Sequence, residues 1–168
     1  MKLNTENIVS VLPLIFIMAP CFKLIYLTAF NKFINTQLIY IGGIIFTTIS
    51  IQMFKQIPYP SSYYKYTMRP QGASGCDYYS AKGLVPDNSP GMPSGHMGTT
   101  AFFIIYNYLY LNNNYKNLTH YKPLIIILFT GLITIMGWAR YKKKCHNIYQ
   151  IIIGSIYGGI MGYLFYLI

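Results

Sequence analysis

A short segment with the composition of an anion-binding turn lies in the middle of the chain, at residues 90–97, directly before an apolar stretch. The hydroxyl of Ser94 can cap a helix that begins here. The backbone N–H groups of a first helical turn, around Gly95, attract anions such as phosphate. His96 would stand beside that anion as a proton donor. These residues alone leave two interpretations open, a phosphate site and an ordinary polar loop that precedes a helix.

Both arginines of the chain and two of its three histidines lie in two polar regions. Arg69 and His96 belong to the long polar region in the middle of the chain, whereas Arg140 and His146 belong to a basic loop at residues 140–147. Arginine is well shaped to hold a phosphate group with two parallel hydrogen bonds. Loops collect polar residues in general, which accounts for the lysines of these regions better than for this arrangement of arginines and histidines. The pattern therefore favours a phosphate site.

The elements that would position these residues are long apolar stretches. Hydrophobic residues make up 54% of the chain and charged residues only 10%, compared with about 25% in soluble proteins. A helix needs about 20 residues to cross a bilayer, and the many tyrosines suit a membrane interface. We therefore expect an all-α fold, a transmembrane helical bundle of about five spans in a single domain over residues 1–168. The apolar stretches are Ile8–Phe30, Leu38–Phe54, Met97–Leu111, Leu124–Ala139 and Ile148–Ile168.

The order of these stretches predicts a topology. Five crossings would put the polar loop after the second stretch and the basic loop after the fourth on the same side of the membrane. The loops that carry the arginines and histidines would then face one compartment. In the last stretch, Gly154, Gly158, Gly159 and Gly162 recur at helical spacing, which favours close contact with another helix.

The charge of the chain restricts its partners. Thirteen basic and three acidic residues give a net charge of +10. In a soluble domain this value would suggest nucleic acid, but the aromatic residues lie in apolar stretches rather than among lysines, so we expect no nucleic-acid partner. An anionic lipid surface and an anionic substrate explain the charge better. Few acids are present for a mechanism based on paired carboxylates, and the three cysteines have no metal-ligand spacing, so we expect neither a metal nor a cofactor.

Three short motifs together resemble a known family. They are Arg69-Pro70, Pro93-Ser94-Gly95-His96, and Arg140 separated by five residues from His146. These resemble the three signature motifs of the type 2 phosphatidic acid phosphatase superfamily, and the resemblance covers residues 65–150. It implies a helical bundle whose motifs meet at one membrane face. It also implies an enzyme that hydrolyses lipid phosphates and diphosphates without a metal.

The chain departs from the family pattern at two positions. The family has a lysine seven residues before the arginine of the first motif, where this chain has Ser62, and the nearest lysine is Lys65, four residues before Arg69. Separations of four and seven both leave two residues on one helix face, so Lys65 could take that role from one turn closer. Gln150 stands where many members have an aspartate. In this it resembles the dolichyl-diphosphatase branch, and small membrane phosphatases of large DNA viruses are also similar.

The resemblance implies a role for each residue. His146 would attack phosphorus and form a phosphohistidine, while Gln150 would accept the N–H of the second ring nitrogen. His96 would protonate the leaving oxygen and then activate water. A neutral amide stabilises an imidazolium less than a carboxylate does, which predicts a slower enzyme than one with aspartate at position 150. The phosphoryl oxygens would bind to Lys65, Arg69, Arg140, Ser94 and the amides near Gly95.

These roles predict a membrane lipid phosphatase with a polyprenyl (dolichyl-type) diphosphate or phosphatidic acid as its substrate. Two alternatives stay open. The same histidine could pass the phosphoryl group or headgroup to a lipid acceptor. The chain could also be an inactive membrane protein that binds phospholipids, an alternative supported by Gln150 and the displaced lysine. The sequence indicates no oligomeric state.

The apolar stretches, the distribution of charge and the family resemblance together bear on the location of the protein. We expect an integral multi-pass protein of an endoplasmic-reticulum-type or other internal membrane. The density of lysine and arginine near the site directs that face to the cytosol by the positive-inside rule, whereas members of the family mostly face a lumen or the periplasm. Cys76 and Cys145 flank the site on the same side. In a lumen they could form a disulfide, and of the two states we favour two free thiols.

Overall fold

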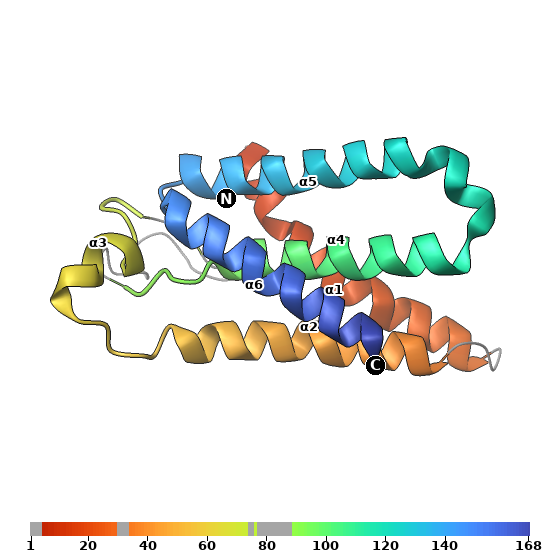
Figure 1. The fold of residues 1–168 in the computed structure, drawn as a ribbon. Helices are drawn as coiled ribbons and strands as arrows, with labels where there is room; N and C mark the ends of the chain where they lie inside the picture. Colours follow the sequence, from red (N-terminus) through yellow and green to blue (C-terminus); the bar gives the residue numbers. More distant parts are fainter. Residues whose placement is uncertain (1–4, 30–33, 74–75, 77–88) are drawn as a thin grey trace.

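The fold is a bundle of long helices. The computed structural model describes residues 5–29, 34–73, 76 and 89–168, and over these ranges the chain is helical and has no strand. The predicted all-α fold is confirmed for these ranges. The long helices are α1 (Thr5–Ala29), α2 (Ile34–Phe54), α4 (Gly95–Asn114), α5 (Lys122–Lys142) and α6 (Ile148–Leu167) (Figure 1). Short helical turns lie in the connections, namely η1 (Ser61–Tyr63), α3 (Tyr64–Thr67) and η2 (Lys116–Tyr121).

Each apolar stretch of the sequence corresponds to one long helix. The clearest difference concerns α4, which begins before and ends after the expected range of 97–111. Polar residues lie in its second half, and Asn107 and Asn114 donate their side-chain amides to main-chain carbonyls one turn earlier.

Three of the long helices are long and apolar enough to cross a membrane: α2 from Asn35, α5 and α6. Within the residues that the structure describes, α1 contributes a shorter apolar stretch, and α4 does not qualify. α4 is the central helix, and none of its residues from Gly95 to Asn112 is exposed. Because other helices surround α4, its side chains need not all be apolar. The chain therefore has the character of a membrane protein with three candidate spans, and five spans stay a prediction.

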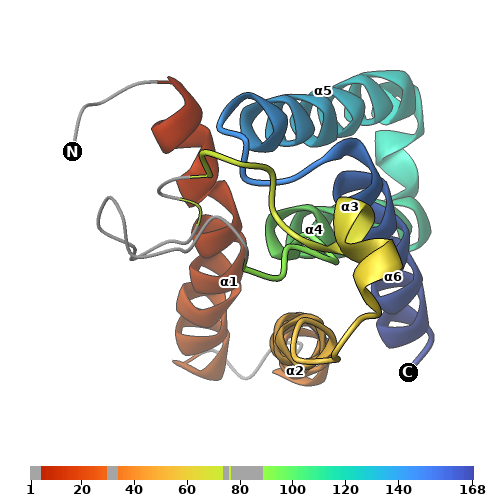
Figure 2. The same ribbon diagram turned by 90° about the vertical axis from the view of Figure 1, so that its left-hand side faces the viewer.

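Both motif-bearing loops meet at one end of the bundle. Figure 1 shows the last turn of α2, the turn α3, the first turn of α4 and the connection from α5 to α6 gathered on its left-hand side. The connection η2 lies at the opposite end. Figure 2, which looks onto the motif end, shows α3 beside α4 and α6. The described parts of the two polar loops thus share one end of the bundle, and their common side of a membrane stays a prediction.

α4 and α6 approach each other closely because glycines of α6 face α4. A Cβ atom at Gly158 would lie 1.9 Å from the carbonyl oxygen of Gly98. A Cβ atom at Gly154 would lie 2.6 Å from the carbonyl oxygen of Ser94. Larger residues would separate the helices at both positions, so the close contact predicted from the glycine spacing is confirmed. The contact holds Ser94 against the first turns of α6.

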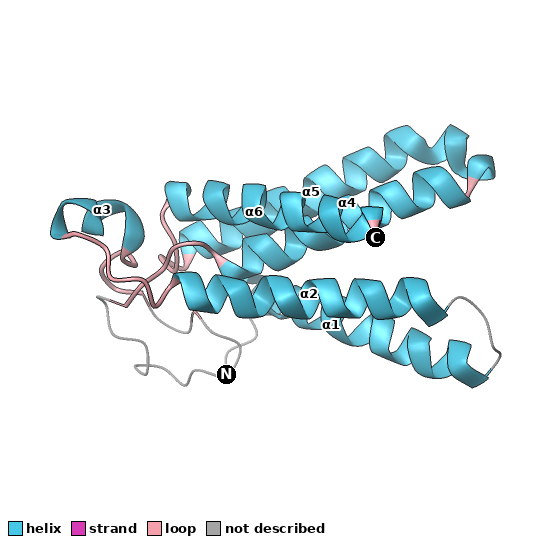
Figure 3. Ribbon diagram, turned by 60° about the horizontal axis from the view of Figure 1, so that its bottom comes forward, coloured by secondary structure: helices cyan, strands magenta, loops and turns pink. Residues whose placement is uncertain are grey.

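The largest apolar cluster lies away from the motif loops. It joins α1, α2 and α4 through Phe16, Tyr40, Ile44, Phe102 and Tyr106, all of which are buried. Figure 3 shows α1 and α2 together on one side of the bundle and α4, α5 and α6 on the other. A smaller buried cluster consists of Met97, Met136 and Ile151. Each of these residues lies next to a motif residue in sequence or one helical turn away from it.

Candidate active site

Ser94 is held by α6 at the point where α4 begins. It is the N-cap residue of α4, as predicted, but its hydroxyl makes no capping hydrogen bond, so that part of the prediction is wrong. Contacts with α6 decide the position of its backbone, because its N–H donates to the carbonyl of Gln150 at 3.1 Å and it packs on Gly154. The hydroxyl is buried and has no hydrogen-bond partner among the described residues. A buried hydroxyl beside a helix N-terminus is a suitable donor for an anion.

Gln150 connects the third motif to the first. Asn147 and Gln150 form a capping box at the start of α6, which the spacing of these two residues in the sequence already indicates. The Oε1 atom of Gln150 lies 3.1 Å from Nδ1 of His146. Its Nε2 atom donates to the carbonyls of Tyr66 and Met68 at 2.9 and 2.8 Å. One buried amide therefore contacts His146 and holds the segment that leads to the first arginine.

These contacts define the tautomer of His146. The amide nitrogen of Gln150 faces two carbonyls, so the atom that faces His146 is the amide oxygen. An amide oxygen only accepts hydrogen bonds, so Nδ1 of His146 carries the proton. The other nitrogen, Nε2, then keeps its lone pair and can act as a nucleophile.

The surroundings of His146 favour its neutral form. The residue lies in the loop between α5 and α6 and is 2% exposed. Burial and then the positive charges of Arg69, Lys55 and Arg140 lower its pKa well below the ordinary value, and only the hydrogen bond to Gln150 acts in the opposite direction. An unprotonated imidazole next to several cations suits an attack on an anionic phosphate.

Arg140 and His96 face each other in the interior. Arg140 is completely buried, and its Nη1 atom lies 3.0 Å from Nε2 of His96. The same nitrogen donates to the carbonyl of Cys76 at 3.0 Å. Nη2 donates to the hydroxyl of Ser10, a contact with α1 that nothing in the sequence indicated. His96 also hydrogen-bonds the main chain of Ser10.

Arg69 enters the same site from the first motif. Its side chain is buried, and its main-chain N–H donates to the carbonyl of Ser89 at 3.0 Å. Two residues after Ser89, the N–H of Gly91 donates to the carbonyl of Thr67 at 2.8 Å. These bonds form a short bridge between the first and second motifs. Gly91 is required here, because a Cβ atom would lie 2.6 Å from Oε1 of Gln150.

The two lysines near the site differ in their environment. Lys65, the lysine that the motif spacing favoured, is exposed, and its Nζ lies 5.8 Å from the ring centre of Tyr66. Lys55 is half-buried at the end of α2, and its positive charge acts on the imidazoles of both His96 and His146. The sequence offered one signal for Lys55, its position directly after the second apolar stretch.

Cys76 and Cys145 form a disulfide, with their Cα atoms 5.3 Å apart. The expectation of two free thiols is therefore wrong. The physical reason is that the helices bring the two polar loops together. The two cysteines, which are 69 residues apart in sequence, therefore become neighbours. Both cysteines are buried beside Ala73.

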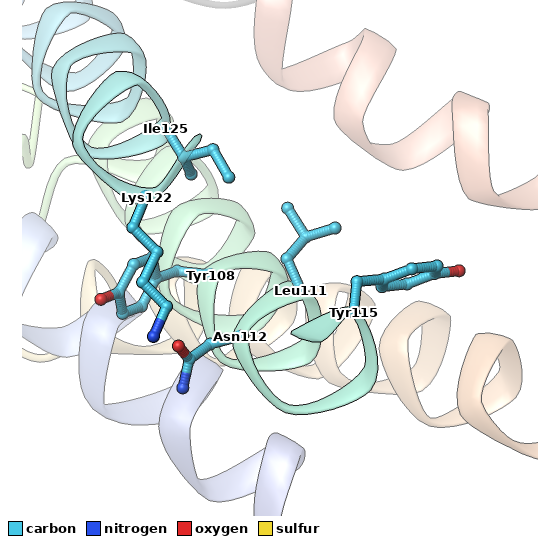
Figure 4. Close-up of a pocket in the computed structure, with 6 residues that line it drawn as sticks. All are labelled: Tyr108, Leu111, Asn112, Tyr115, Lys122 and Ile125. Carbon is cyan, nitrogen blue, oxygen red and sulfur yellow. The ribbon is translucent and has the colours of Figure 1, made fainter. Parts of the chain in front are cut away.

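The structure thus brings together Arg69, Ser94, His96, Arg140, His146 and Gln150 at one end of the bundle. Within the described ranges, no three His, Cys, Asp or Glu side chains form a metal-binding cluster. A shallow pocket lies at the opposite end, between α4 and α5 (Figure 4), and contains none of the motif residues. It is lined by Tyr108, Leu111, Asn112, Tyr115, Lys122 and Ile125.

The sequence from residue 36 onward identifies the family of the chain. No curated protein and no solved structure matched it. A family model described as the PAP2 superfamily matches residues 36–168, a range that contains all three motifs and leaves out α1. Because the match covers well over half of the chain, the protein belongs to the PAP2 superfamily.

Proposed function

We propose that this protein is a metal-independent membrane lipid phosphatase that works through a phosphohistidine at His146. Membership of the PAP2 superfamily supports a phosphatase-type function. The observation that carries the proposal is the pair of buried histidines. His146 is fixed by Gln150 at 3.1 Å and His96 lies 3.0 Å from a guanidinium nitrogen of Arg140. A nucleophile, an acid and phosphate-binding cations are thus available in one place.

In the first step, the Nε2 lone pair of His146 attacks phosphorus and the bond between phosphorus and the leaving oxygen breaks. Gln150 keeps the proton on Nδ1, where the developing positive charge of the ring strengthens their hydrogen bond. Arg69 and Arg140 bind the phosphoryl oxygens and stabilise their charge in the transition state.

His96 donates a proton in the first step and accepts one in the second. When the phosphate binds, Arg140 redirects its donors to the phosphoryl oxygens, so Nε2 of His96 can carry a proton and deliver it to the leaving oxygen. In the second step, His96 removes a proton from water, the water oxygen attacks phosphorus, and the phosphorus–nitrogen bond breaks. His146 returns to its neutral form and inorganic phosphate leaves.

The substrate of this reaction is a lipid phosphate. Large apolar side chains are exposed on the outward faces of α2, α5 and α6, as expected for contact with acyl chains. Our first candidate is a polyprenyl diphosphate of the dolichyl type, because the third motif with Gln150 is similar to that branch. Phosphatidic acid is the second candidate.

The decisive experiment measures phosphate release from a polyprenyl diphosphate and from phosphatidic acid, in EDTA, by the purified full-length protein. We expect activity from the wild type and a loss of at least about 1,000-fold in His146→Ala, the scale seen when a nucleophile is removed. His120→Ala is the matched control, because His120 is exposed in η2 at the other end of the bundle.

Two results would overturn the proposal: activity that disappears in EDTA, and activity that survives in His146→Ala. A lipid acceptor added to the same assay tests for transfer. Phosphorylated acceptor in place of inorganic phosphate would make the protein a transferase that uses the same histidine.

A further inference from the structure

We propose that Lys55 supplies the lysine of the phosphate site. The proposal rests on the phosphatase function proposed above. It assigns a binding residue outside the three motifs, in the place that the motif spacing gave to Lys65.

The geometry at the end of α2 supports this role. Ile51 is completely buried against the first turn of α4, because a Cβ atom at Gly98 would lie 2.4 Å from its Cδ1. It also lies 3.8 Å from the Cβ position of Gly95. The N–H of Lys55 donates to the carbonyl of Ile51 at 3.3 Å, so the helical register continues to this lysine. Residues four apart share a helix face, and Lys55 is therefore directed towards the side on which α4 begins.

Contacts with α6 hold the same turn of α2 in place. Phe54 makes an edge contact with the ring of Tyr157, with ring centres 5.3 Å apart. The hydroxyl of Tyr157 donates to Ser50 at 2.6 Å. The last turn of α2 thus contacts both helices whose N-termini carry the second and third motifs, α4 and α6.

Charge and exposure separate the two lysines. The charge of Lys55 acts on both catalytic imidazoles, and its side chain is half-buried. Lys65 is exposed and lies over the ring of Tyr66. A half-buried ammonium whose charge acts on both histidines can attract the phosphoryl group, whereas an exposed one contributes little because water screens it.

The test compares Lys55→Gln with Lys65→Gln, which removes the same charge from the same type of residue. We expect Lys55→Gln to lower kcat/KM for phosphate release by about 100-fold, as for loss of one transition-state donor. Lys65→Gln should stay within about threefold of the wild type, as expected for an exposed charge. Lys55→Arg keeps the charge and should recover part of the loss.

The pH profile adds a readout that misfolding alone would not move. Besides Lys55, the charges that act on His146 come from Arg69 and Arg140, and His96 is its titratable neighbour. Removing Lys55 raises the pKa of His146, so the acid limb of kcat/KM should move to higher pH in Lys55→Gln and stay in place in Lys65→Gln. A larger loss in Lys65→Gln, or an unmoved acid limb in Lys55→Gln, would overturn the assignment. If the wild type hydrolyses no lipid phosphate, the proposed function fails, and NMR titration of His146 in the same variants still tests Lys55.

A second inference rests on different contacts, those of α1. We infer that Ser10 is a positioning residue for both Arg140 and His96. Its hydroxyl accepts a hydrogen bond from Nη2 of Arg140, and its main chain bonds the ring of His96. α1 lies outside the residues that match the family model, so the family match does not itself assign a role to Ser10.

Ser10→Ala removes the acceptor of Arg140 and should lower kcat/KM about tenfold, the scale of a hydrogen bond to a charged group. Ser10→Thr keeps a hydroxyl and should restore most of the activity. Ser155→Ala is the matched control, because the hydroxyl of Ser155 donates within its own helix, to the carbonyl of Ile151 at 2.8 Å. Equal activity in Ser10→Ala and the wild type, or no recovery in Ser10→Thr, would exclude the positioning role.

Discussion

At the scale of single residues, the hydrogen bonds of Gln150 explain why a glutamine rather than an aspartate suits this position. Its amide oxygen contacts Nδ1 of His146 and the N–H of Asn147, and its amide nitrogen donates to the carbonyls of Tyr66 and Met68. A carboxylate could accept the first two bonds, but it has no hydrogen to donate to the two carbonyls. The glutamine thus orients His146, the nucleophile that we propose, and also holds the segment that leads to Arg69.

Gln150→Asp should therefore be slower than the wild type, the reverse of what charge alone predicts. The substitution leaves the carbonyls of Tyr66 and Met68 without their donor, at a cost of about 1–3 kcal/mol for each buried group. We expect at least a tenfold lower kcat/KM and a lower Tm in detergent. Gln150→Glu serves as the length-matched control. An aspartate variant with higher activity and an unchanged Tm would contradict this account.

The pH dependence of the reaction should reflect His146. In the proposed mechanism the neutral form of His146 is the nucleophile. The value of kcat/KM should therefore be at its maximum above the pKa of His146 and fall as the pH drops through that pKa. Burial and three neighbouring cations lower that pKa, so the fall should occur below the ordinary histidine value of about 6.5. Gln150→Leu removes the contact that raises this pKa, and its acid limb should lie at still lower pH. An acid limb above pH 6.5 in the wild type would contradict the nucleophilic role of a buried His146.

At the scale of elements, the contact between α4 and α6 sets the distance between the segments that carry the second and third motifs. His96 lies in the first turn of α4, and His146 precedes α6 by two residues. The two helices touch through Gly98 and Gly158, and the N–H of Ser94 bonds the carbonyl of Gln150. A change far along this contact should therefore alter the site.

Gly158→Ala tests that coupling. A Cβ atom here would lie 1.9 Å from the carbonyl oxygen of Gly98, so the helices must separate. We expect a destabilisation of about 1–3 kcal/mol, as for overpacked cores, together with lower activity. Gly159→Ala is the control, because its Cβ atom would make an ordinary contact at 3.7 Å with Ile105. Thermal unfolding and phosphate release should separate the two variants, and equal behaviour would contradict the role of the contact.

At the scale of the whole molecule, the disulfide relates the site to its compartment. Cys76 and Cys145 join the two polar loops, and the carbonyl of Cys76 accepts a hydrogen bond from Arg140. Disulfides persist in oxidising compartments, which favours a lumenal or extracytosolic face for the motif end. The sequon Asn117-Leu118-Thr119 belongs to η2, at the opposite end of the bundle.

The intact protein should therefore yield a peptide pair linking Cys76 to Cys145 in non-reducing mass mapping. Cys145→Ser should lower kcat/KM, because the disulfide then no longer fixes Cys76, whose carbonyl accepts a hydrogen bond from Arg140. Cys21→Ser, which leaves this disulfide intact, is the control. Glycosylation at Asn117 in cells would contradict the orientation, because it would place η2 in the lumen.

The sequence by itself predicted the helices and most residues of the site that we propose. Long apolar stretches form helices whatever their neighbours, and Arg69, His96, Arg140 and His146 stand in motifs of fixed spacing. The glycine spacing of α6 also predicted its close contact, because small residues at helical intervals have few other uses in an apolar helix.

Only the tertiary structure decided which groups meet. Lys65 satisfies the helical spacing and is exposed on α3, whereas Lys55, which we propose for the site, is half-buried at the end of α2. Ser10 contacts Arg140 across 130 residues of sequence, and the two cysteines pair across 69. Local spacing reports which residues share one helix face, whereas contacts between helices depend on how the whole bundle packs. For this reason the motifs could be identified in the sequence, whereas the contact of Ser10 with Arg140 and the pairing of the two cysteines could not.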